Sequence, residues 1–413
     1  MFLSVLVITL MPQIYKIYLQ STKVLPYILA RCQYLLIFEG KRLFFCRWEP
    51  RFGMFFLSLE RKKNSNTLYI LNMKKILVTG GTGFIGSHTT VELQQKGYEV
   101  FIVDDLSNSS ADVIDNIAKI TGVKPHFGKV DVADKEQLFG FLRQHPGIES
   151  VIHFAASKAV GESVQQPLKY YRNNLNGVIN ILDAMKEFKI KNLVFSSSCT
   201  VYGQPEKLPV TEQSPIQPAL SPYGNTKQIN EEIIRDFVKV NPEIHCIALR
   251  YFNPIGAHPS SLIGELPLGV PANLIPYITQ TAAGIRECLS VFGDDYNTPD
   301  GTAIRDYIDI IDLANAHIAA INRMEQGKQK AGLEFFNIGT GNGLSVLQLI
   351  KTFEEATGVK LNYKIVGRRE GDIEKVWADT TYANQELGWK AVVPLQETLR
   401  NAWNWQQKLK NNK

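Results

Sequence analysis

Short apolar runs alternate with longer amphipathic stretches through most of this chain. The runs are rich in Val, Ile, Leu and Phe and lie at 76–80, 100–105, 151–156, 193–198 and 247–252. Apolar residues at helical spacing lie between them, for example over 85–96 and 176–188. Continuous apolar strands separated by helices are typical of a parallel sheet that is covered on both faces. The pattern therefore predicts an α/β fold with a doubly wound parallel sheet.

The pattern changes after Asn253, where loops rich in Pro and Gly separate scattered helical stretches. We expect one domain over residues 73–253 that contains the sheet. A smaller, more irregular α/β domain over 254–413 then supplies substrate contacts. The sequence contains no internal repeat.

Residues 1–72 differ from both of these regions. They contain 13 aromatic residues and only two glycines, without a clear period of 2 or 3.6. The apolar opening stops at Pro12, so it is too short for a membrane span, and it has no clear basic n-region or cleavage site of a signal peptide. A weak membrane anchor is the alternative interpretation. We interpret 1–72 as an extension that is unstructured or that precedes the true start at Met73, because MKKILVTGG opens a strand two residues later.

Composition supports a folded, cored protein, since 45% of the 413 residues are apolar and 21% are charged. The formal net charge of +5 arises in 1–72, which holds ten basic and three acidic residues. The rest holds 35 basic and 37 acidic residues. This balance gives no reason to expect a nucleic-acid or membrane partner.

Cysteine and histidine positions exclude two further classes of site. The five cysteines are an odd number without paired spacing, so we expect no disulfide framework and a reducing, cytoplasmic location. The seven histidines have no metal-ligand spacing to one another or to a cysteine. We predict no metal.

A glycine-rich turn, Gly80-Gly81-Thr82-Gly83-Phe84-Ile85-Gly86, follows the first strand and opens a helix. In a dinucleotide site, Gly80 makes the tight turn, Gly83 lets the backbone approach a pyrophosphate, and Gly86 lets the helix pack closely. Alone, the run also fits an ordinary strand-to-helix turn. Asp104 ends the next strand, where a carboxylate accepts hydrogen bonds from both ribose hydroxyls and repels a 2′-phosphate. With no Arg at 105–109, the sequence predicts a Rossmann-type site for NAD rather than NADP.

A second signal combines Ser198, at the end of a strand, with Tyr223 and Lys227 on a later helix. Positions i and i+4 share a helix face, so the Lys227 ammonium can lie beside the Tyr223 phenol and favour its anionic form. A phenolate is a plausible base, and Ser198 can hydrogen-bond the same substrate oxygen. A Tyr-x-x-x-Lys pattern alone occurs often by chance. Its order after a glycine fingerprint and a strand-end Ser is far more specific.

From Met73 to about Gln406 the chain resembles the extended short-chain dehydrogenase/reductase superfamily, and within it the UDP-glucose 4-epimerase family. The resemblance rests on VTGGTGFIGSHT, HFAASKAVGESVQQPLKYYRNNLNG, FSSSCTVYG, SPYGNTK, LRYFNPIGAHPS, NLIPYI, VFGDDYNTPDGTAIRDYI and RREGD. It excludes residues 1–72.

The resemblance implies a set of NAD contacts. Besides the three glycines and Ser198, Tyr223 and Lys227, they are Phe84, Ile85, Asp104, Asp105, Leu106, Ser107, Asn108, Ser109, Asp131, Val132, Phe154, Ala155, Ala156, Ser157, Lys158, Asn173 and Phe252. Phe154 and Phe252 would otherwise be interpreted as ordinary core residues at strand ends.

The resemblance also implies contacts to a UDP-hexose substrate. They are Ser198, Tyr223, Asn253, Asn273, Leu274, Ser290, Val291, Phe292, Arg305, Arg369, Asp372 and Val376. Arginines suit two phosphates because a guanidinium binds phosphate oxygens in a fixed fork geometry. Without the family, each Arg could equally belong to a surface ion pair.

The implied reaction is an epimerisation in which Tyr223 removes the proton from the sugar 4-hydroxyl while NAD takes hydride from C4. The 4-keto sugar turns over, and hydride returns to its other face. The family usually forms homodimers. Where some members carry Tyr, this chain has Val376, and the smaller side chain leads to the hypothesis that UDP-GlcNAc and UDP-GalNAc are also interconverted. An ordinary packing valine is the alternative.

Other functions of the same fold make different demands. Dehydratases place an Asp-Glu pair after the strand-end hydroxyl, and here Cys199 and Thr200 follow Ser198. A glucuronate epimerase or a decarboxylase must bind a C6 carboxylate, and the sequence leaves that alternative open. Non-catalytic relatives commonly lack Tyr or Lys of the motif, whereas both are present here.

Overall fold

The computed structural model describes residues 34–39, 42–49, 53–62, 65–71, 73–369 and 372–411. The chain divides into two units, Met1–Met73 and Lys74–Lys413, and each is described by itself. The remaining residues, which include Glu370 and Gly371 of the RREGD motif, lie outside the described part.

The first unit contains four antiparallel strands in sequential order, which differs from the expectation of an unstructured extension. The strands are β1 (Tyr34–Glu39), β2 (Arg42–Glu49), β3 (Gly53–Lys62) and β4 (Ser65–Leu71). Aromatic and aliphatic residues favour strands when neighbouring strands pair with them. These strands lack strict alternation of apolar and polar residues and are not framed by turn residues, so the sequence pattern does not reveal them. The hypothesis of a start at Met73 stays a prediction.

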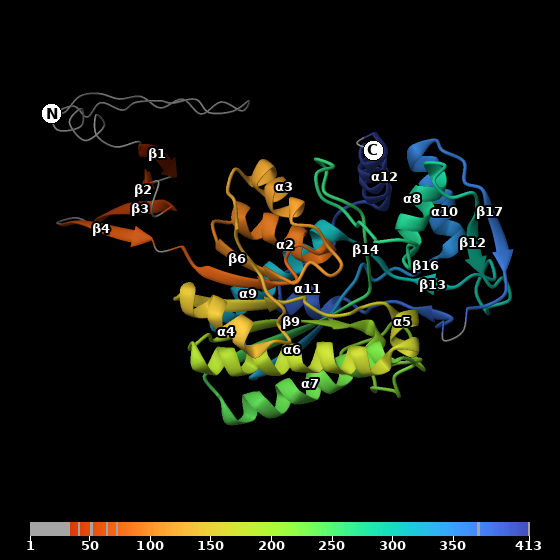
Figure 1. The fold of residues 1–413 in the computed structure, drawn as a ribbon, viewed down its shortest axis with the longest axis horizontal. Helices are drawn as coiled ribbons and strands as arrows, with labels where there is room; N and C mark the ends of the chain where they lie inside the picture. Colours follow the sequence, from red (N-terminus) through yellow and green to blue (C-terminus); the bar gives the residue numbers. More distant parts are fainter. Residues whose placement is uncertain are drawn as a thin grey trace. The chain divides into compact units, whose positions relative to one another are not determined.

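A seven-stranded sheet forms the centre of the second unit, in the order β15-β10-β9-β8-β5-β6-β7 (Figure 1). All of its neighbouring strands are parallel. Its strands are β5 (Lys75–Thr79), β6 (Glu99–Asp104), β7 (His126–Lys129), β8 (Ile148–His153), β9 (Asn192–Ser198), β10 (His245–Tyr251) and β15 (Leu333–Ile338). The predicted doubly wound α/β class is confirmed.

Helices cover both faces of this sheet because successive strand side chains point to opposite sides. Ile76 and Val78 of β5 pack in one core with α2 (Phe84–Gln95), α3 (Asp112–Thr121) and α9 (Ile310–Glu325). Leu77 packs in a second core with α4 (Lys135–Gln144), α6 (Pro167–Glu187) and α7 (Pro222–Val240). The near-continuous apolar strands in the sequence reflect this double burial.

The segments after residue 253 build small sheets and a third core. The pairs are β11 (Asn253–Ile255) with β14 (Tyr307–Asp309), β12 (Leu289–Phe292) with β17 (Tyr363–Val366), and β13 (Ile304–Arg305) with β16 (Leu344–Ser345) and β18 (Lys375–Val376). The longer helices are α8 (Leu274–Ala282), α10 (Val346–Thr357) and α12 (Leu395–Asn411). The short ones are α5 (Val160–Gln165), α11 (Thr381–Glu386) and the 3-10 turn η1 (Cys199–Tyr202).

The predicted boundary at residue 253 does not separate the sheet from the rest of the chain. Strand β15 pairs with β10 along its whole length, and α9 packs on the same core as α2. The chain therefore leaves the sheet after β10, builds the small sheets, and returns to complete the sheet. Sequence alone does not reveal this return because β15 is a single short run among loops.

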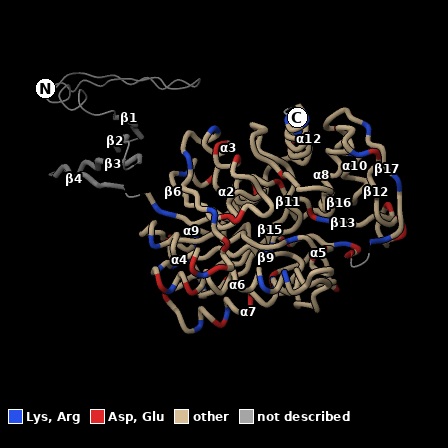
Figure 2. The backbone as a smooth tube through the Cα atoms, viewed as in Figure 1, with Lys and Arg blue, Asp and Glu red and all other residues tan. Residues whose placement is uncertain are grey.

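Charged residues of both signs are spread along the described chain (Figure 2). In the part of the chain that the structure describes, no helix is both long enough and apolar enough to cross a bilayer.

Candidate active site

The glycine-rich turn joins β5 to α2 and leaves no room for side chains at two positions. Gly80 has a φ of +69°, and a Cβ there would lie 2.8 Å from the backbone N of Ala155. A Cβ on Gly86 would collide with the carbonyl oxygen of Gly80. Gly83 is the N-cap of α2, so the free N–H groups of the first helical turn face the turn. These features fit the pyrophosphate of a dinucleotide.

Asp104, the last residue of β6, lies beside this turn. Its carboxylate accepts hydrogen bonds from the Thr82 backbone N–H (3.1 Å), the Leu106 backbone N–H (2.9 Å) and the Ser109 hydroxyl (3.0 Å). The buried carboxylate thus orders the segment 104–109 that was predicted to hold the adenosine ribose. In the described part of the chain, the hydrogen-bond partners of this carboxylate are two backbone N–H groups and one hydroxyl.

The residues after β7 and β8 lie at the same carboxyl edge of the sheet. Asp131 accepts a hydrogen bond from the Ala133 backbone N–H (2.8 Å), and Val132 is buried. In the loop after β8, the Ala155 backbone N–H donates to Thr79 (3.2 Å). The Asn173 side chain donates to the Ser157 hydroxyl (3.3 Å), so these two predicted NAD contacts lie together.

Ser198, Tyr223 and Lys227 meet where β9 ends and α7 begins. Pro222 opens α7, and the Ser221 hydroxyl caps it by accepting from the Gly224 backbone N–H (3.1 Å). Lys227 is 3% exposed, and its ammonium donates to the Ser196 carbonyl at 2.6 Å. The Lys227 Nζ lies 5.8 Å from the centroid of the Tyr223 ring. The three residues are brought together as predicted.

The electrostatics of Tyr223 differ from the sequence prediction. Burial raises the pKa of Tyr223 to about 12, and a hydrogen bond with Ser198 lowers it only in part. Lys227 is not among the groups that shift this pKa, because its ammonium is directed to the Ser196 carbonyl. That Lys227 favours the anionic phenol stays a prediction. Burial also lowers the pKa of Lys227 to about 8.

On the substrate side, several predicted residues lie at element ends. Phe252 is buried directly after β10, and the backbone N–H of Asn253 donates to the Asp306 carbonyl (3.0 Å). Asn273 is the N-cap of α8, and Leu274 begins that helix. The Asn273 side chain donates to Glu265 (2.5 Å), which also receives Lys158 at 3.4 Å.

Two predicted arginines share one carboxylate. Arg305 on β13 donates to Asp372 (2.6 Å), and the more exposed Arg369 donates to the same oxygen (3.3 Å). The Arg369 guanidinium lies 5.8 Å from the ring centroid of Phe292 on β12, the strand that also carries Ser290 and Val291. The structure therefore gathers Phe292, Arg305, Arg369 and Asp372.

Val376 contacts both the arginine cluster, through Arg305, and the end of the central sheet, through Phe252. It is paired with Arg305 across β13 and β18, and it is 2% exposed. It packs in a small apolar cluster that includes Phe252, with Cys199 against it.

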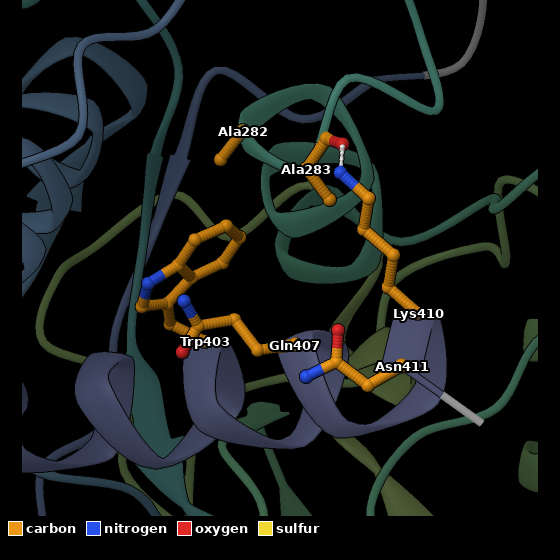
Figure 3. A pocket seen from close by; sticks show the side chains of 6 residues that line it. All are labelled: Ala282, Ala283, Trp403, Gln407, Lys410 and Asn411. Atoms are coloured by element: carbon orange, nitrogen blue, oxygen red, sulfur yellow. Dashed lines mark hydrogen bonds between the residues drawn. The ribbon is translucent and has the colours of Figure 1, made fainter.

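Two surface hollows lie outside this arrangement. One of about 410 Å³ lies between α8 and α12, and the Lys410 ammonium within it donates to the Ala283 carbonyl (2.9 Å; Figure 3). The other, of about 400 Å³, is bordered by Gly293, Asp295 and Arg368, next to the predicted nucleotide residues. No predicted site residue lines either hollow.

Sequence reasoning missed several residues that contact the site. Glu265 receives both Lys158 and Asn273, and no motif marks it. His153 is buried at the end of β8, where it hydrogen-bonds Thr79 (2.8 Å). Glu231 is buried on α7, eight residues after Tyr223, and the helical period could have identified it.

Comparison with known proteins shows the family of this chain. A family model described as GDP-mannose 4,6 dehydratase matches residues 77–402. The UDP-glucose 4-epimerase of Dictyostelium discoideum is 49% identical over 332 residues, which cover 80% of this chain and 95% of that protein. The chain belongs to the UDP-glucose 4-epimerase family.

Solved structures of UDP-glucose 4-epimerases have the same fold. The enzyme of Stenotrophomonas maltophila, crystallised with NAD and formylated UDP-arabinopyranose, is 46% identical with a TM-score of 0.79. The match covers 83% of this chain and 100% of the chain of that enzyme. The enzyme of Bifidobacterium longum, in complex with NAD+ and UDP, is 45% identical, has a TM-score of 0.79, and covers 82% of this chain and 100% of its own.

Proposed function

We propose that this chain interconverts UDP-galactose and UDP-glucose, with NAD as its tightly bound cofactor. The observation that carries the proposal is the meeting of Ser198, Tyr223 and Lys227 at the sheet edge that also carries the glycine-rich turn. A proton-transfer group beside a dinucleotide site is the arrangement that reversible oxidation of a sugar hydroxyl needs. The predicted UDP contacts Arg305 and Arg369 suit the diphosphate.

Each residue of the proposed centre has one task. NAD, when bound, would supply a reversible hydride acceptor for C4. Tyr223 takes the proton of the 4-hydroxyl and later returns it, while Ser198 hydrogen-bonds the same oxygen. Lys227, whose pKa is lowered to about 8, adds positive charge at neutral pH and so favours the phenolate. The 4-keto sugar would have to rotate before Tyr223 returns the proton.

The UDP part must be held while the sugar turns. We propose that Asn253, Asn273, Leu274, Ser290, Val291, Phe292, Arg305, Arg369 and Asp372 hold it. The shared carboxylate of Asp372 supports this assignment, because it orients both guanidinium groups. The phosphates would then meet donors that are already aligned.

Val376 supports a second substrate pair, UDP-GlcNAc and UDP-GalNAc. Its side chain is small and packs against Phe252 and Cys199, two residues that flank the catalytic edge. A valine at this position leaves more space than a tyrosine for an acetamido group.

We also propose a cytoplasmic homodimer. The free thiols of Cys199, Cys246 and Cys288 support a reducing compartment. Exposed apolar residues on α6, Leu168 and Ile179, support a partner surface on the face where α6 and α7 lie (Figure 1). Sedimentation analysis of the purified protein tests the dimer, and a monomer at micromolar concentration would contradict it.

One assay tests the main proposal. Purified protein is incubated with UDP-galactose without added NAD, and UDP-glucose is measured. Conversion is expected, because a tightly held cofactor copurifies. If added NAD also fails to produce UDP-glucose, while circular dichroism indicates a folded protein, the proposed function is refuted.

A further inference from the structure

A buried carboxylate continues the face of α7 that carries Tyr223 and Lys227. Glu231 follows Lys227 by four residues, so all three residues lie on one face of the helix. Its side chain is 4% exposed. An ionised carboxylate is costly to bury and persists only where several donors satisfy it. The fold thus maintains this charge directly behind the catalytic pair.

Glu231 joins α7 to two strands of the sheet. Its carboxylate accepts from the Arg250 Nε (2.9 Å) and Nη2 (2.6 Å) on β10. It also accepts from the Ser197 hydroxyl on β9 (2.6 Å). Because Ser196 receives Lys227 and Ser198 neighbours Tyr223, three consecutive serines on β9 each contact a different part of this helix face. The carboxylate therefore fixes the axial position of α7 relative to Ser198.

Glu231 also determines the charge around Lys227. The ammonium lies 5.8 Å from the Tyr223 ring centroid on its own helix and 5.0 Å from that of Phe195 on β9, and its charge acts on His153 of β8. Tyr251 and Arg250 of β10 are the other titratable groups of this region. Burial lowers the pKa of His153 to about 3 and raises the pKa of Tyr251, so both side chains are neutral near pH 7. Burial lowers the pKa of Lys227, and the negative charge of Glu231 opposes that decrease. Of the charged groups around Lys227, Glu231 is the anion, and Arg250, which pairs with it at 2.6 Å, is a cation.

We propose that Glu231 is a positioning residue for the epimerisation, which holds Tyr223 and Lys227 against β9 and supplies the negative charge that keeps Lys227 protonated. This inference rests on the proposed function. The wild-type assay with UDP-galactose tests that function alone, so a failure of the two ideas can be told apart.

The chain offers a matched control for this carboxylate. Glu334 on β15 is also buried against an arginine, Arg323 on α9, with Arg323 Nε and Nη2 donating at 2.7 and 2.9 Å. Both side chains of each pair are 4% exposed. No predicted site residue is a partner of Glu334. A merely structural role would affect the two pairs alike.

The experiment measures kcat between pH 6 and 9.5 for the wild type, Glu231→Gln and Glu334→Gln, together with Tm. In Glu231→Gln, the alkaline limb of the pH profile of kcat should shift to lower pH by about one unit. At each pH on that limb, kcat should then be about tenfold lower than in the wild type. Glu231→Asp, which keeps the charge, should keep the wild-type limb. Glu334→Gln should lower Tm without moving the limb. An unmoved limb in Glu231→Gln would overturn the proposal.

A double variant keeps the test decisive if Glu231→Gln does not fold. Replacement of a buried ion pair by apolar residues is often tolerated, whereas removal of one partner leaves a bare charge. Glu231→Met/Arg250→Met is therefore measured in the same way. Its kcat should fall, because the ion pair and the hydrogen bond from Ser197 that hold α7 against the sheet are gone. A kcat equal to that of the wild type would refute the positioning role of Glu231.

Discussion

Lys227 and Arg369 illustrate two ways in which this chain presents a positive charge. Lys227 is 3% exposed and donates at 2.6 Å to a main-chain carbonyl of the central sheet. The Arg369 side chain is 56% exposed and shares Asp372 with Arg305 at a longer distance of 3.3 Å. The first group is fixed by the core, whereas the second can change partners when a phosphate arrives.

The difference follows from what each region has to do. Proton transfer depends steeply on distance and orientation, so Ser198, Tyr223 and Lys227 are placed on regular elements that pack into the core. Phosphate binding depends on charge and tolerates a mobile side chain, so it uses strand ends and loops. A substitution on the catalytic side should therefore change kcat, and one on the nucleotide side should change KM.

Tyr223→Phe should have the largest effect. Loss of the phenol removes the proton-transfer group, and general acid–base catalysis typically contributes about 10²- to 10⁴-fold. We expect kcat to fall by this factor while UDP affinity, measured by calorimetry, stays within a few-fold. Turnover similar to that of the wild type would mean that Tyr223 is not the proton-transfer group.

Arg305→Met should produce the opposite kinetic signature. A charge-assisted hydrogen bond to phosphate contributes about 1.5–3 kcal/mol, so KM for UDP-galactose should rise roughly 10- to 100-fold with little change in kcat. Arg369→Met should raise KM less, because that side chain is more exposed. A fall in kcat at unchanged KM would assign Arg305 to the catalytic side.

His317→Gln tests the rigid core beneath the catalytic side. His317 packs against Phe154 and Tyr251, and burial lowers its pKa to about 4. Below pH 6.5 the unfolded chain binds a proton that the folded chain does not, so the wild type loses stability as pH falls towards 4. Between pH 6.5 and 4, the free energy of unfolding of the variant, measured in urea, should therefore rise relative to that of the wild type by about 1.4 kcal/mol for each pH unit of acidification. A constant difference between pH 7 and 5 would contradict this assignment.

Val376→Tyr should have the smallest effect on UDP-galactose, because Val376 lies where the two sides meet. We expect kcat/KM for UDP-galactose to stay within about threefold, while the larger ring in a packed cluster lowers the free energy of unfolding by about 1–3 kcal/mol. Interconversion of UDP-GlcNAc and UDP-GalNAc should be lost. If the wild-type protein does not interconvert UDP-GlcNAc and UDP-GalNAc, the proposal of a second substrate pair is refuted.

Much of the fold and part of the site could be predicted because each signal was local. Five strands of the sheet are apolar runs, and the glycine turn lies directly between one strand and a helix. Strand β7 was missed because HFGK has no apolar run. The contact of Lys227 with the Ser196 carbonyl was hidden because main-chain groups carry no mark in the sequence. The raised pKa of Tyr223 was missed because burial depends on packing by distant segments.

Strand β15 also has a consequence for how the chain is made. It lies beside β10, but 81 residues separate the end of one strand from the start of the other. During synthesis the sheet therefore cannot be completed until the ribosome has also produced residues 252–332, which include Asn253, Phe292 and Arg305. Both ends of that excursion are then anchored in adjacent strands. The central sheet and the segment between β10 and β15 thus belong to one compact unit, Lys74–Lys413, whose sheet closes only after that segment has been made.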